Sequence, residues 1–96
     1  TTFELKSATG KVIKAFTQND QELKNLINKK GYIYTAGERL DNIASVAVPI
    51  FNNKENFTGT LSISGWRQFF TNKSVAKFYK ILSGYQNQMK RLVSNE

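Results

Sequence analysis

The chain contains no cysteine and no histidine among its 96 residues. The missing cysteine excludes disulfides, thiolate nucleophiles and zinc–thiolate sites. The missing histidine removes the commonest general base and metal ligand. The seven carboxylates form no clustered pair along the sequence. We therefore predict that the chain is not an enzyme, that it has no catalytic residues, and that it binds no metal or cofactor.

Long hydrophobic runs are also missing, and there is a single proline. No stretch of about 18 apolar residues is present, so we expect no membrane-spanning helix. Nothing in the composition marks a linker, and the length fits one domain over residues 1–96. Hydrophobic residues make up 40% of the chain and aromatic residues 12%, which is enough apolar material to form a core.

The net charge of +7 is spread along the sequence. The only adjacent basic pairs are Lys29-Lys30 and Lys90-Arg91, and no nucleic-acid-binding motif accompanies them. A solvated basic surface explains this pattern. A small basic domain that binds nucleic acid through scattered lysines is the alternative, in which Trp66, Phe69 and Phe70 stack on bases instead of packing in a core or interface.

The hydrophobic pattern predicts an α+β fold with helices packed on an antiparallel sheet. The expected strands are residues 3–5, 32–34, 43–51 and 57–65. The expected helices are residues 7–16, 17–30 and 72–94. The strand at residues 43–51 is apolar on both faces, which indicates a central position. Pro49 lacks an N–H group, so it should lie near the strand end or beside an unpaired position.

The strand at residues 57–65 has two unlike faces. One carries Thr58, Thr60, Ser62 and Ser64, and the other carries Phe57, Gly59, Leu61 and Ile63. A four-residue loop at Asn52–Glu55 would pair Ser45 with Ser62 and Ile43 with Ser64. The hydroxyl row would then lie beside Ile43, Ser45 and Ala47. Such a face is either open to solvent or the floor of a pocket for a small polar ligand.

Two helices offer further candidate sites. The turn Ser7-Ala8-Thr9-Gly10-Lys11 opens the first helix, with Ser7 or Thr9 as its cap. Its free N–H groups favour a carboxylate or phosphate, although an ordinary capped helix explains the same residues. The last helix has an apolar stripe at three- and four-residue spacing. The stripe packs on the sheet or, in part, on another subunit. It consists of Val75, Phe78, Leu82, Tyr85, Met89 and Leu92.

Taken together, these segments resemble the C-terminal effector-binding domain of IclR-type transcriptional regulators. The resemblance covers most of the chain and rests on an ordered series of short motifs. These are Ser7-Ala8-Thr9-Gly10-Lys11 with Ala15, Gly31-Tyr32 with Glu38, Ala47-Val48-Pro49-Ile50-Phe51, and Ser62-Ile63-Ser64-Gly65. The winged helix-turn-helix domain of the family, and the helix and hairpin that lead its effector domain, have no counterpart here, so an incomplete effector domain is expected.

The resemblance implies a GAF- or profilin-like sensor domain in the cytoplasm. Its partner would be a small organic acid, a carboxylate or aromatic acid, that modulates DNA binding by a separate winged helix-turn-helix domain. Self-association into a dimer or tetramer is also implied. Carried over position by position, the ligand-binding residues would be Ala8, Thr9, Thr35 (in a loop), Ile43, Ser45, Ser62 and Ser64. A purely structural oligomerisation module remains an alternative.

Overall fold

The computed structural model describes residues 7–37 and 41–94, so the strand predicted at residues 3–5 lies outside the described residues. The elements, in chain order, are α1 (Ala8–Thr17), α2 (Gln21–Lys30), β1 (Ile33–Ala36), β2 (Ile43–Phe51), β3 (Phe57–Trp66), the 3-10 turn η2 (Arg67–Phe69) and α3 (Asn72–Ser94). The predicted α+β architecture is confirmed.

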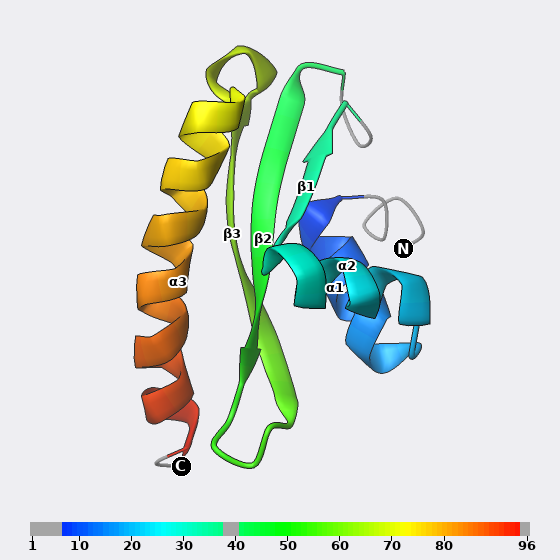
Figure 1. Ribbon diagram of the computed structural model, residues 1–96, viewed down its shortest axis with the longest axis vertical. Helices are drawn as coiled ribbons and strands as arrows, with labels where there is room; N and C mark the ends of the chain where they lie inside the picture. The colour runs from blue at the N-terminus through cyan, green and yellow to red at the C-terminus, as the bar shows by residue number, and fades with distance from the viewer. Residues whose placement is uncertain (1–6, 38–40, 95–96) are drawn as a thin grey trace.

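The three described strands form one antiparallel sheet in the order β1-β2-β3. The apolar strand β2 is central, as its two apolar faces predict. Helices α1 and α2 cover one face of the sheet, and α3 runs along the opposite face (Figure 1). We call these the α1 face and the α3 face.

Local side-chain chemistry fixes where the helices begin and end. Ser7 caps α1 by accepting a hydrogen bond from the Gly10 N–H, as predicted. Asp20 caps α2 in the same way, and α2 therefore begins later than the Thr17 start that we expected. Thr71 caps α3: its hydroxyl accepts from the Ser74 N–H, and the Ser74 hydroxyl accepts from the Thr71 N–H.

Gly31 ends α2 in the left-handed conformation, with φ of 89°. A β-carbon at this position would also collide with the Tyr79 hydroxyl of α3. The backbone angle therefore favours glycine, and a larger residue would also have to displace the end of the Tyr79 side chain. This junction ties the end of α2 to the helix on the opposite face of the sheet.

The two faces of the sheet carry separate apolar clusters. On the α1 face the buried residues are Ala8, Val12, Ala15, Ile27, Ile33 and Ala47. On the α3 face they are Ala44, Val46, Val48, Phe70, Val75 and Leu82. Of the stripe predicted on the last helix, Val75, Phe78 and Leu82 pack on the sheet, whereas Tyr85 and Leu92 are exposed. The stripe therefore serves the core in its first half only.

The register between β2 and β3 differs from the predicted one by two residues. Ser45 pairs with Ser64 instead of Ser62, and Ile43 pairs with Trp66 instead of Ser64. The loop is one residue longer than expected, because Phe51 pairs with Phe57. A bulge after Ile50 adds a second residue. A shift of one residue would move the side chains of β3 to the opposite face, and a second shift returns them. Ile43, Ser45, Ser62 and Ser64 therefore still share one face, as predicted.

The bulge also moves Phe57 to the other face of the sheet. Strand alternation predicted Phe57 beside Leu61 and Ile63, but its ring stacks on Phe16 of α1, with the centroids 5.1 Å apart. Thr58 is the extra residue, and its hydroxyl donates to the Ile50 carbonyl. A bulge changes the face on which neighbouring side chains project, and here it directs Phe57 into the core at the hairpin end.

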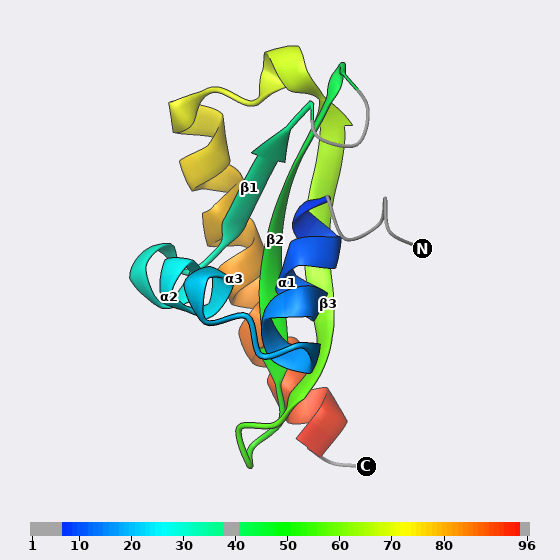
Figure 2. The ribbon, with the colours of Figure 1, turned by 90° about the vertical axis from the view of Figure 1, so that its right-hand side faces the viewer.

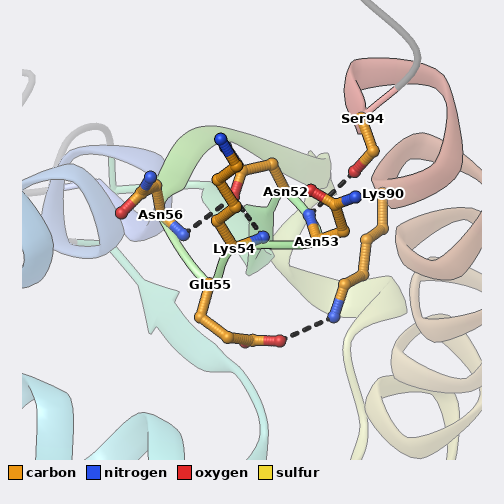
Figure 3. A network of polar contacts seen from close by, with 7 residues as sticks. All are labelled: Asn52, Asn53, Lys54, Glu55, Asn56, Lys90 and Ser94. Carbon is orange, nitrogen blue, oxygen red and sulfur yellow. Dashed lines mark hydrogen bonds and ion pairs between the residues drawn. The ribbon is translucent and has the colours of Figure 1, made fainter.

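A polar network holds the β2–β3 hairpin against the end of α3 (Figure 3). The Asn52 side chain accepts from the Lys54 and Asn56 N–H groups, which shapes the loop. The Asn53 N–H donates to the Ser94 hydroxyl, and Lys90 donates to Glu55 at 2.8 Å. These contacts link the loop to a helix that is about forty residues further along the chain.

Pro49 lies beyond the stretch of β2 that pairs with β1. The pairing of β1 starts at Ile33 opposite Ala47, so β1 provides no partner for Pro49. The Pro49 carbonyl accepts instead from the Gln86 side chain of α3. The predicted position beside an unpaired stretch is thus observed.

Candidate functional site

Three hydroxyl side chains form one row straight across the sheet. Thr35 of β1 pairs with Ser45 of β2, and Ser45 pairs with Ser64 of β3. The neighbouring row toward the hairpin consists of Ile33, Ala47 and Ser62. Because directly paired residues share a face, Thr35, Ser45 and Ser64 all project on the α1 face. We call Thr35, Ser45 and Ser64 the hydroxyl row. Ser62 lies beside this row on the same face.

Within the part of the chain that the structure describes, none of these four hydroxyls takes part in a side-chain hydrogen bond. Thr35 and Ser45 are 5% and 7% exposed, whereas Ser62 and Ser64 are exposed. Thr60, one step further along the same face, has a fully buried hydroxyl without a partner. Polar groups in such positions normally find a partner, so this face has unused hydrogen-bonding capacity.

Helix α1 points its N-terminus toward this row. Phe16, near the end of α1, contacts Phe51 and Phe57 at the hairpin end of the sheet. Ala8, at the start of α1, belongs to the cluster of Ile33 and Ala47, which is the row next to the hydroxyls. Figure 2 shows α1 beginning part of the way along the sheet and leaving the end of β1, β2 and β3 beyond it without a described helix.

Two backbone donors in the first turn of α1 have no acceptor within residues 7–37 and 41–94. The Gly10 N–H donates to the Ser7 side chain, and the Lys11 N–H donates to the Ser7 carbonyl. The N–H groups of Ala8 and Thr9 are the remaining donors of this turn, which has no intrahelical acceptor for them. They lie at the positive end of the helix dipole, where a negative charge is stabilised by about 0.3–1 kcal/mol.

Ile43 and Trp66 border the hydroxyl row on the side away from α1. They pair with each other, and strand alternation places them on the same face as Ser45 and Ser64. Trp66 is 57% exposed. It also lines a pocket of about 810 Å³ together with Asn42, Arg67, Gln68 and Phe69. The site face is therefore polar in the middle and apolar at this edge.

The sequence-predicted residues come together with one correction. Ile43, Ser45, Ser62 and Ser64 share one face, and Ala8 and Thr9 open the helix beside it. Thr35, predicted in a loop, lies on β1, where it pairs with Ser45. Sequence reasoning missed Trp66, because the strand was expected to end at Gly65. The apolar residue that continues the alternation after Ser62 and Ser64 was the available signal.

This arrangement has hydrogen-bond donors that an anion could accept from. Hydroxyls and backbone N–H groups donate hydrogen bonds to a carboxylate. No cluster of acidic side chains suited to holding a metal ion occurs among the described residues. In the described part of the chain, no helix is long and apolar enough to cross a membrane. The hydroxyls of the sheet and the first turn of α1 thus place hydrogen-bond donors on one face of the protein.

Comparisons with known proteins show which family the chain belongs to. The family model described as the bacterial transcriptional regulator IclR C-terminal region matches residues 2–91. No curated protein sequence that was compared is similar enough to count as a relative. Several solved structures share the fold.

The Thermotoga maritima IclR structure is 23% identical with a TM-score of 0.81, and the match covers 95% of this chain and 47% of that one. The C-terminal domain of the E. coli transcriptional regulator KdgR is 16% identical with a TM-score of 0.78, covering 95% and 71%. An IclR transcriptional regulator from Alicyclobacillus acidocaldarius is 27% identical with a TM-score of 0.65, covering 81% and 34%. The chain thus spans about half the length of the first of these structures.

The fold and the matched family define a domain of a transcriptional regulator and not of an enzyme. More specifically, the chain belongs to the IclR C-terminal family of bacterial transcriptional regulators, because the family model covers nearly its whole length.

Proposed function

We propose that this chain is the ligand-sensing domain of an IclR-type regulator and that its effector is a small carboxylate or aromatic acid. The observation that carries the proposal is the row of Thr35, Ser45 and Ser64, one hydroxyl from each strand, beside the N-terminus of α1. A row of donors next to a positive helix end suits an anion with further polar groups.

The carboxylate of the effector would accept hydrogen bonds from the N–H groups of Ala8 and Thr9. It would also accept from the Ser62 or Ser64 hydroxyl. Thr35 and Ser45 lie deeper, at 5% and 7% exposure, and would bind the polar groups on the rest of the ligand. Each hydrogen bond to a charged group contributes about 1.5–3 kcal/mol, which is enough to fix the orientation of a small acid.

The organic part of the effector would contact Ile43 and Trp66. An exposed indole at the edge of a polar row favours a planar or aromatic ligand, because stacked aromatic rings gain about 0.5–1.5 kcal/mol beyond their buried area. This edge is the reason to retain aromatic acids beside aliphatic carboxylates as candidate effectors.

Binding would act on transcription through the assembly of the whole protein. We infer a GAF- or profilin-like sensor that associates into a dimer or tetramer in the cytoplasm. DNA recognition would be carried out by a separate winged helix-turn-helix domain. The effector would shift the equilibrium between two subunit arrangements by the difference in its affinity for them.

A ligand screen followed by serine variants tests the proposal. Small carboxylates and aromatic acids, each with its uncharged amide as a control ligand, would be screened for a rise in melting temperature of the chain. We expect a rise with one or a few acids and none with the amides. Ser64→Ala should then weaken binding of that acid about tenfold or more, in line with loss of one charged hydrogen bond.

Ser83→Ala is the matched control, because Ser83 lies on α3, on the opposite side of the sheet. It should leave the affinity unchanged. Unaltered affinity in both Ser62→Ala and Ser64→Ala would contradict the proposed site, and the absence of a response to every acid would contradict the proposed ligand class.

A further inference from the structure

Helix α3 carries a stripe of basic side chains that the ligand-sensing function does not use. The segment from Phe57 to Ser94 contains six basic residues and no acidic one. Four of the six lie on the outer side of α3, opposite the sheet, and all four are exposed. We call this set the basic stripe: Lys73, Lys77, Lys80 and Arg91.

The fold gathers charges that the sequence shows as scattered. At 100° per residue, the four side chains lie within an arc of about 60°, and Lys73 and Arg91 are about 27 Å apart along the axis. Val75 and Leu82, which bury against the sheet, project from the opposite side of the helix. The stripe therefore follows the part of α3 that is furthest from the core.

No acidic side chain neutralises the stripe within residues 7–37 and 41–94. Lys90, on the flank of α3, is paired with Glu55. None of the four stripe residues forms an ion pair with another described residue, and no carboxylate lies between Lys80 and Arg91. Gly84 lies between Lys80 and Arg91 on the same side of α3. A β-carbon at Gly84 would meet no atom within 4 Å apart from the backbone of the helix itself. A partner can thus approach the helix backbone closely at the centre of the stripe.

We propose that the basic stripe of α3 contacts the phosphate backbone of double-stranded DNA independently of base sequence. Lysine and arginine on a straight helix are the usual donors to phosphate, and such contacts position a protein without reading the bases. The chain belongs to a family of transcriptional regulators, a class of protein that acts on DNA. This contact would add to operator recognition elsewhere in the protein and does not depend on the effector site.

Other partners fit the stripe less well. A second copy of this chain would bring like charges together, which opposes pairing through this surface. A membrane surface requires apolar side chains among the basic ones that insert between lipids. An acidic helix would likewise need an apolar anchor within the stripe. The exposed apolar residues of α3, Ile81, Tyr85 and Leu92, lie on one flank beside the stripe and not within it, so neither partner would meet them while it contacts all four basic side chains.

Fluorescence anisotropy with a labelled duplex of random sequence, titrated over a range of salt concentrations, tests the contact. For four phosphate contacts the logarithm of affinity should fall with the logarithm of salt with a slope of about −3 to −4. The double variant Lys77→Gln and Lys80→Gln should reduce the magnitude of the slope by about 2 and weaken binding at low salt at least tenfold.

Lys29→Gln with Lys54→Gln is the matched control, because it removes the same charge from α2 and the hairpin loop. It should leave the slope within about 0.5 of the original value. Circular dichroism would verify that both variants are folded. Equal loss in the two variants, or no binding of DNA by the unaltered chain, would overturn the proposal.

Competition distinguishes DNA from other anionic partners. Polyglutamate and vesicles of anionic phospholipid would be added at the same concentration of negative charge as unlabelled duplex. The proposal expects the duplex to displace the probe at least tenfold more effectively than either competitor. Equal displacement by polyglutamate would identify an acidic protein surface as the partner, and equal displacement by vesicles would identify a lipid surface; either result would overturn the DNA assignment.

Discussion

Helix α3 covers its face of the sheet with apolar contacts along β2 and β3, whereas α1 and α2 cover only part of the other face (Figures 1 and 2). Alternate residues of one strand serve the two faces. Ser45 projects on the α1 face, and Val46, its neighbour, is fully buried beneath α3. The two faces therefore differ in character: the face beneath α3 is apolar, whereas the face beside α1 is apolar in part and carries a row of hydroxyls in part.

The largest effect is expected from removing apolar contact on the α3 face. Leu82→Ala should lower the free energy of unfolding by about 2–5 kcal/mol, because Leu82 is 4% exposed and packs in the core. Leu92→Ala, the same substitution on the same helix at 61% exposure, should cost less than about 0.5 kcal/mol. Urea unfolding monitored by Trp66 fluorescence gives both values. Similar losses in the two variants would contradict the assignment of α3.

Exchanging hydroxyl and methyl groups tests whether the two faces of the sheet differ in how well they tolerate a polar side chain. Val46→Thr places a hydroxyl in the apolar cluster of the α3 face and should cost about 1–3 kcal/mol. Thr35→Val removes a hydroxyl that has no side-chain hydrogen bond among the described residues, so stability should be unchanged or slightly higher. The same Thr35→Val variant should lose affinity for the effector. Chemical denaturation and ligand titration measure the two effects; a destabilised Thr35→Val would show that its hydroxyl is structural.

The smallest expected effect concerns the hairpin that sets the register of the two faces. Asn52→Ala removes the side-chain acceptor for two loop N–H groups and should lower stability by about 1 kcal/mol. Asn53→Ala retains its backbone donation to Ser94 and should cost about half as much or less. Thermal unfolding compares the two variants. Identical melting temperatures would mean that the loop is held by its backbone alone.

Much of the fold follows from local pattern. The apolar run at residues 43–51 predicts the central strand, and Ser7, Asp20 and Gly31 mark helix boundaries by their hydrogen-bonding and backbone preferences. The resemblance to the IclR effector domain supplied the residues of the candidate site, and strand alternation predicted only that those of β2 and β3 share a face, as they do. The helix boundaries and the shared face could be predicted because each depends on only a few neighbouring residues.

The pairing of the strands could not be obtained in this way. The loop length and the bulge at Thr58 together shift the register by two residues, and neither has a strong local signal. Thr35 was placed in a loop because its partner Ser45 lies ten residues away. Trp66 was missed because β3 continues one residue beyond the expected glycine. Each error concerns a contact between distant segments, which only the packed sheet specifies.

The sequence by itself determined the class of chemistry: without cysteine, histidine or paired carboxylates, the chain offers hydroxyls, amides and basic side chains. Tertiary packing decides which of these groups meet. It aligns Thr35, Ser45 and Ser64 across three strands, and by burying Val75 and Leu82 against the sheet it leaves the basic side of α3 facing away from the core. The physical reason is that residue type fixes what a group can bond, whereas strand register and helix packing fix its neighbours.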